Sequence, residues 1–182
     1  ASFPMPQPEP LALNRHDQIA DWVINCLDQE GMCVFQTYVS QAVRICQALR
    51  PRRSDLRGLT LIVGSEPLTQ AKHREIASTG ARVYLRYAAT EMGTIAMGCG
   101  YPEKIDELHL VSDMIAMIQP NEVLPGQTAP FFFSTLNDVM PKVMINVQLG
   151  DMGVVHEREC GCVFETIGFH THISHVRSYE RA

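Results

Sequence analysis

The sequence lacks the features that mark a membrane or secreted protein. No apolar run reaches the roughly 18 residues that a membrane-spanning helix needs, and the N-terminal stretch ASFPMPQPEP has no basic region followed by an apolar one. A secretory signal and a membrane partner are therefore not expected, and the predicted location is cytoplasmic. The chain also contains no internal repeat and no long low-complexity segment.

Basic residues are in the minority. Fifteen Lys and Arg stand against 20 Asp and Glu, which gives a formal net charge of -5 and a pI near 5.8. Because proteins that bind nucleic acid present a basic surface, nucleic acid is not an expected partner. The one basic run, RPRRSDLR at 50–57, is more typical of a solvated loop than of a phosphate contact.

The chain contains enough apolar residues to build a hydrophobic core. It has 182 residues, 46% of them hydrophobic, and a mean hydropathy of -0.04. A chain of this size can bury one substantial core, or one core with a small appendage.

Helix and strand signals alternate through the first hundred residues, which predicts a mostly parallel sheet flanked by helices. Apolar residues at helical spacing or in short buried runs predict these elements: helices at 14–30, 40–49 and 68–80, and strands at 32–36, 59–64 and 81–88. After Gly100 the sequence pattern changes to short strand-like runs separated by Pro, Gly and Asn, at 107–120, 129–136, 141–151 and 163–168. These runs predict antiparallel strands that form a partial barrel.

The expected fold class is therefore α/β, in three segments. Residues 1–13, with Pro at positions 4, 6, 8 and 10, are predicted to be an extended linker. Residues 14–104 are predicted to form an α/β subdomain with the nucleotide site, and residues 105–182 an antiparallel β subdomain with a candidate zinc knuckle.

The six cysteines favour a metal site over a disulfide framework. Cys160 and Cys162 form a tight pair in RECGC, while Cys99 and His109 lie ten residues apart. Three Cys and one His match the closed tetrahedral ligand set of structural zinc. The alternative is that these thiols are free and unrelated. The remaining cysteines stand singly among apolar residues, as buried free thiols do: Cys26, Cys33 and Cys46.

The stretch YAATEMGTIAMGC at 87–99 places one carboxylate, Glu91, among small and apolar residues. Thr90 is a good helix N-cap and Glu91 suits a first helical turn, so the pair could start a helix. Alternatively, Glu91 is a ligand for a magnesium–phosphate complex. The histidines of GFHTHISH at 168–175 predict a half-exposed strand in preference to a second metal site.

Three motifs in order resemble the signatures of the adenylate-forming superfamily of acyl-CoA synthetases, adenylation domains and luciferases. They are GSEPLT at 64–69, YAATE at 87–91 and QLGD at 148–151. Within it, FFFSTLNDVMPKVMINVQLGDMG and RECGC most resemble the phenylacetate–CoA ligase branch, which also has a similar Cys, His and C-x-C pattern. The resemblance spans residues 56 to 169 and implies activation of a carboxylic acid, an aromatic one by extension from the branch.

The resemblance also implies a role for each matching residue. Thr90 would donate its hydroxyl to a phosphate, and Glu91 would hold the magnesium that bridges the ATP phosphates. The acyl group would then pass from AMP to CoA. The residues that would contact ATP or AMP are Gly64, Ser65 and Glu66 at the adenine, Tyr87 at the adenine or acyl group, and Asp151 at the ribose hydroxyls. For Asp151 an ordinary turn, and for Tyr87 simple core packing, remain alternatives.

The chain also departs from the superfamily pattern. It has no Ser/Thr/Gly-rich phosphate loop with its lysine upstream of GSEPLT, and no C-terminal domain with a catalytic lysine. Phe169 stands where the family has an arginine. We therefore expect a fragment of an acyl-adenylate-forming ligase that is inactive alone. An apolar face left by the missing parts would favour a homo-oligomer.

The alternative function is a non-catalytic, zinc-stabilised α/β module for binding or assembly. A dinucleotide-binding domain is disfavoured because no glycine fingerprint follows an early strand.

Overall fold

The computed structural model describes residues 12, 14–120, 122, 124, 126–140 and 142–179. The predicted linker at 1–13 lies outside these residues, apart from position 12. The helices are α1 (His16–Glu30), α2 (Val39–Leu49), α3 (Gln70–Ala77) and α4 (Val163–Thr166). The strands are β1 (Cys33–Tyr38), β2 (Leu59–Gly64), β3 (Arg82–Ala89), β4 (Gly93–Gly98), β5 (Leu108–Leu110), β6 (Ile115–Ile118), β7 (Ala129–Pro130), β8 (Phe132–Thr135), β9 (Asp151–Glu157) and β10 (Thr171–Ser178).

The first part of the chain folds as predicted. Helix α1 ends at Gly31, whose positive φ of 70° lets its N–H bond to the carbonyl of Leu27. Thr69 caps α3 with its side chain. Strands β1, β2 and β3 are parallel, and helices α1–α3 bury their apolar faces with these strands in one hydrophobic cluster.

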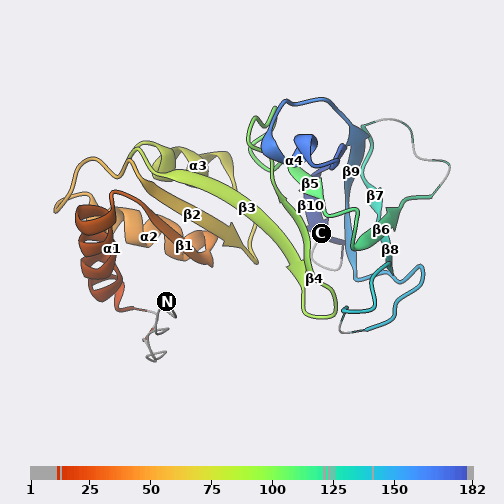
Figure 1. Ribbon diagram of the computed structural model, residues 1–182, viewed down its shortest axis with the longest axis horizontal. Coiled ribbons are helices and arrows are strands. Elements are labelled where there is room, and N and C mark those ends of the chain that lie inside the picture. The colour runs from red at the N-terminus through yellow and green to blue at the C-terminus, as the bar shows by residue number, and fades with distance from the viewer. Residues whose placement is uncertain are drawn as a thin grey trace.

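One eight-stranded sheet, in the order β1-β2-β3-β4-β5-β10-β9-β7, joins the two halves of the chain. Strand β3 is long and runs out of the helical half toward β4 and the second half (Figure 1). The two halves have separate hydrophobic clusters: one from residues 20–81, and others from residues 92–144 and 96–173. The split at residue 104 remains a prediction.

The prediction of a mostly parallel sheet is wrong, because the sheet is mixed. Among the described strands, only β1–β2 and β2–β3 are parallel; β4, β5, β10, β9 and β7 all pair antiparallel. The physical reason lies after β3, where the chain reverses in a tight turn at 90–92 and returns as β4. A hairpin needs only such a turn, whereas a parallel return needs a crossover connection.

No partial barrel forms in the described part of the chain either. The late strand β10 inserts between β5 and β9, so the antiparallel strands extend the same open sheet, and β6 and β8 form a separate two-stranded ribbon. At two of the predicted strand-like runs, the structure also differs from the prediction. Residues 163–168 contain the short helix α4, and in the run 141–151 the positive φ of Asn146 interrupts extended backbone before β9 begins at Asp151.

Two further features bear on function. None of the six cysteines is disulfide-bonded. None of the described helices combines the length and the apolar character needed to cross a bilayer.

Candidate functional site

A cleft of about 570 Å³ opens beside the carboxyl ends of β2 and β3, where β3 faces β5 and the end of β10. In α/β sheets with parallel strands, ligands collect at this edge. Four residues that the sequence marks as nucleotide contacts line this one cleft, although they come from three separate motifs: Ser65, Glu66, Tyr87 and Asp151. The rest of the lining comes from neighbouring positions: Pro67, Leu85, Arg86, Ala88, Leu108, Val176, Arg177 and Ser178.

Tyr87 and Asp151 are in direct contact across the cleft. The Tyr87 hydroxyl donates to Oδ2 of Asp151 over 2.6 Å. Burial, together with the adjacent carboxylate, raises the pKa of Tyr87, so the phenol stays protonated and remains the donor. Among the described residues, no bond is made to Oδ1 of Asp151, which leaves this oxygen able to accept a hydroxyl from a ligand.

Glu66 connects the loop after β2 to two helices. Its carboxylate accepts from the Ser40 hydroxyl at 2.6 Å and the Ser40 N–H at 3.0 Å. Lys72 Nζ lies 3.2 Å from Oε2. The Ser40 hydrogen bond outweighs the cost of burial and, with Lys72, lowers the pKa of Glu66. Glu66 therefore stays ionised and holds the start of α2 against the cleft wall.

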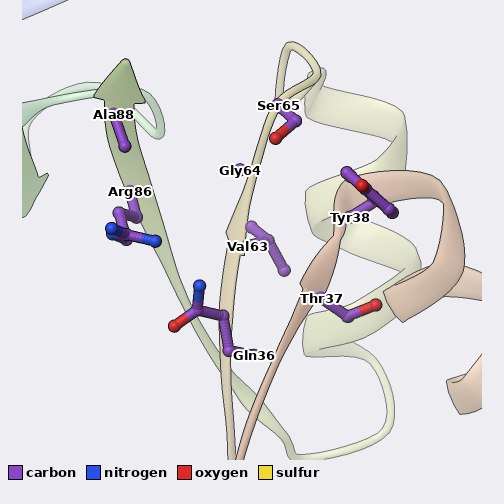
Figure 2. A pocket seen from close by; sticks show the side chains of 8 residues that line it. All are labelled: Gln36, Thr37, Tyr38, Val63, Gly64, Ser65, Arg86 and Ala88. Carbon is purple, nitrogen blue, oxygen red and sulfur yellow. The ribbon is translucent and has the colours of Figure 1, made fainter. Parts of the chain in front are cut away.

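Gly64 and Ser65 border a second, smaller hollow of about 350 Å³ at the carboxyl ends of β1 and β2 (Figure 2). A Cβ on Gly64 would lie 2.7 Å from the carbonyl oxygen of Arg86, so only glycine lets β2 approach β3 this closely. Ser65 has a φ of 63°, a conformation that is uncommon for residues with a side chain. Ser65, Arg86 and Ala88 line both the hollow and the cleft, so the two cavities adjoin.

Thr90 and Glu91 lie apart from these cavities. They occupy the tight turn between β3 and β4, where the N–H of Met92 bonds to the carbonyl of Ala89. The alternative that they start a helix is wrong, because strand β4 follows. Neither residue lines the cleft or the hollow. A magnesium ion held mostly by ATP phosphates needs few protein ligands, so the magnesium role of Glu91 stays a prediction.

The residues that the sequence predicts as metal ligands lie close together in the structure. Ligand atoms of Cys99, His109, Cys160 and His172 all lie within 4.8 Å of one another, which makes a possible Cys₂His₂ metal site. Cys162 borders the same group, with its Sγ 3.1 Å from Nε2 of His109. All four predicted ligands are therefore together, and His172 adds a fifth donor.

The two imidazoles are oriented as metal ligands usually are. Nδ1 of His109 lies 2.7 Å from the Phe169 carbonyl, and Nδ1 of His172 lies 2.9 Å from the His170 carbonyl. With Nδ1 protonated to donate these bonds, each Nε2 presents a lone pair to the thiols. Among the described side chains, Nε2 of His172 is the one buried nitrogen or oxygen atom without a hydrogen-bond partner. A cation bound at this point would satisfy it, so the donor set fits zinc.

A buried charged pair supports this cluster. Glu107 accepts from Arg158 at 2.8 and 3.1 Å and from Nε2 of His156 at 2.9 Å. Burial opposes ionisation of Glu107, but Arg158 and the Glu103 N–H outweigh it and hold its pKa at about 2. Arg158 Nη2 also lies 3.6 Å from Sγ of Cys99.

Sequence reasoning missed Glu107, His172 and Arg158. The half-exposed strand expected at 168–175 overlaps β10, in which His172 is fully buried and His175 is exposed. His172 is buried because it pairs with His109 on β5. The signal available was the alternation of GFHTHISH, which puts every second residue on one face.

No protein-family profile and no curated protein sequence matches this chain. Solved structures do match in fold. The chain aligns with apo MatB from Rhodopseudomonas palustris at a TM-score of 0.56 and 19% identity, over 76% of this chain and 30% of MatB. With the amide bond synthetase McbA from Marinactinospora thermotolerans, the TM-score is 0.56 at 13% identity, over 85% of this chain and 33% of McbA.

O-succinylbenzoate coenzyme A synthetase (MenE) from Bacillus subtilis gives a TM-score of 0.53 at 15% identity, over 74% of this chain and 33% of MenE. The chain thus spans about a third of the length of each of these enzymes. The likeness concerns the fold and favours no single branch of this group. In fold, this chain resembles the N-terminal domain of adenylate-forming ligases.

Proposed function

We propose that this chain supplies part of the nucleotide and acyl site of an acyl-adenylate-forming ligase. The carboxylate of a small acid attacks the α-phosphate of ATP, which gives acyl-AMP and pyrophosphate. The thiol of CoA, or another thiol, then attacks the acyl carbon and releases AMP. The sequence motifs, rather than the fold, resemble the phenylacetate–CoA ligase branch, and on that resemblance we extend the proposal to an aromatic acid.

One observation carries the proposal. Residues from three motifs that are widely separated in the sequence line a single cleft, and Tyr87 and Asp151 bond directly within it. In this role Asp151 accepts a hydrogen bond from a ribose hydroxyl through Oδ1, while Tyr87 holds the carboxylate in place and offers its ring to the adenine or acyl group. The fold likeness to MenE, a coenzyme A synthetase, supports the same proposal.

A structural zinc ion is part of this proposal. Cys99, His109 and Cys160 would hold it, with His172 or Cys162 completing a tetrahedral set. Zinc bound there ties together three segments: the end of β4, the strand pair β5–β10 and the RECGC turn. It supplies stability to the second half of the chain and takes no part in acyl transfer.

The same cluster favours a second candidate function. If the cleft binds no nucleotide, the chain is a zinc-stabilised α/β module for binding or assembly, with the Cys/His group as its organising feature. The two candidates differ in what they require of Asp151. The ligase site needs its free carboxylate oxygen, whereas the module makes no use of it.

Paired assays on the 182-residue chain test the proposal. Isothermal titration calorimetry with AMP should give saturable binding, while ATP–pyrophosphate exchange should be absent because the chain has no phosphate loop. Absence of AMP binding would overturn the nucleotide-site proposal and favour the module. Robust exchange by these 182 residues would instead contradict the expectation that the chain is inactive alone.

A further inference from the structure

The described side chains that line the smaller hollow beside the cleft carry a positive charge and no carboxylate. Among the described residues that line it are Gln36, Thr37, Tyr38 and Ser65, and Arg86 is the one charged member. No carboxylate is paired with Arg86 in the described part of the chain. A half-buried guanidinium in a hollow without an acid is suited to an anionic ligand.

Arg86 is held in position before any ligand arrives. Its Nε donates to the Thr94 hydroxyl over 2.8 Å, across the β3–β4 hairpin. Its backbone is fixed as well, since Gly64 packs against the Arg86 carbonyl. The Nη groups remain as donors, and Figure 2 shows the guanidinium of Arg86 and the amide of Gln36 turned toward each other. Little side-chain entropy is then lost on binding.

We propose that Arg86, assisted by the Gln36 amide, binds the carboxylate of a small organic acid in this hollow. The inference rests on the proposed function, because it names where the acid lies relative to the nucleotide. A volume of about 350 Å³ is within the range of small-molecule sites. Since Ser65 and Arg86 line both cavities, a carboxylate bound there adjoins the nucleotide cleft. The acids of the cleft do not compete, because Glu66 is paired with Lys72 and Asp151 accepts from Tyr87.

Ligand-observed NMR titrations of the 182-residue chain test this assignment. The probes are the carboxylates acetate, benzoate and phenylacetate, with the neutral benzamide as a comparison. At least one carboxylate should bind, and benzamide should bind much more weakly. Arg86→Gln should weaken carboxylate binding about 10-fold or more, because a charge-assisted bidentate contact is lost. Gln36→Leu should weaken it by a smaller factor.

Arg82→Gln is the matched control, since Arg82 lies on the same strand, is exposed and lines neither cavity. Should Arg86→Gln fold poorly, Arg86→Lys keeps the charge but loses the bidentate geometry and should give an intermediate affinity. Binding unchanged in folded Arg86→Gln, or no binding by any carboxylate probe, overturns the inference.

AMP titrations of the same samples separate this inference from the proposed function. Carboxylate binding that depends on Arg86, without AMP binding, would support the acid site and overturn the nucleotide site. AMP binding without carboxylate binding would do the reverse. If Arg86→Gln lost AMP but kept benzoate, Arg86 would serve a phosphate, and the assignment made here would be wrong.

Discussion

The hydroxyl of Tyr87 on β3 donates a 2.6 Å hydrogen bond to the carboxylate of Asp151 at the start of β9, 64 positions further along the chain. Tyr87→Phe removes the donor and leaves a part-buried carboxylate oxygen without its partner. We expect the free energy of unfolding to fall by about 1 to 3 kcal/mol, measured by urea denaturation. Tyr84→Phe on the same strand, whose hydroxyl has no described hydrogen bond, should stay within about 0.5 kcal/mol of wild type. Equal effects of the two substitutions would show that the bond adds nothing to stability.

The low pKa of Glu66 predicts how stability depends on pH. Because folding lowers this pKa below its ordinary 4.5, ionised Glu66 stabilises the native state fully above that value. The contribution is lost as pH falls through the folded pKa. Urea denaturation at a series of pH values should therefore show wild type more stable than Glu66→Gln at pH 7, with the gap shrinking below about pH 4.5. A gap that stays constant through that range would contradict the Ser40 and Lys72 contacts as its cause.

Gly64 should not tolerate a side chain. A Cβ at this position would meet the Arg86 carbonyl at 2.7 Å, so Gly64→Ala must push β2 and β3 apart where both cavities meet. We expect a loss of about 1 to 3 kcal/mol in thermal or urea unfolding. Gly64→Ala with wild-type stability would mean that the two strands are less closely packed than described.

The Cys/His cluster predicts about one zinc ion per chain in protein purified without chelator, measured by elemental analysis. His172→Ala should lower both the zinc content and the melting temperature, as should a Cys160→Ser, Cys162→Ser double variant. His170→Ala is a matched control, because His170 is exposed and contributes only its backbone carbonyl. Protein that carries no zinc after expression in zinc-supplemented medium would rule out the site.

Local signals predicted the first half of the fold well. Apolar residues at helical spacing and in short buried runs act over a few residues, and they mark helices α1–α3 and parallel strands β1–β3. The turn after β3 was not predicted, because Thr90 and Glu91 also suit the start of a helix. What decides it is Gly93, whose φ of 72° allows the chain to turn back into β4.

Long-range pairing explains what could not be predicted. The sheet order places β10, from the end of the described chain, between β5 and β9. This pairing buries His172 beside His109 and brings Arg158 to Glu107, and no periodicity within one segment encodes such a contact. The four predicted metal ligands and the residues that line the cleft could be singled out as candidates from the sequence, because each lies in a recognisable local motif.

Calorimetric titration of AMP into wild type, Asp151→Asn and Asp113→Asn tests the nucleotide site most directly. Asp113 is exposed and lines neither the cleft nor the hollow, so its variant controls for loss of charge alone. We expect wild type and Asp113→Asn to bind AMP alike, and Asp151→Asn to bind about 10-fold more weakly because an amide replaces the charged acceptor of the ribose hydroxyl. No binding by wild type, or equal binding by all three proteins, would contradict a nucleotide site at Asp151.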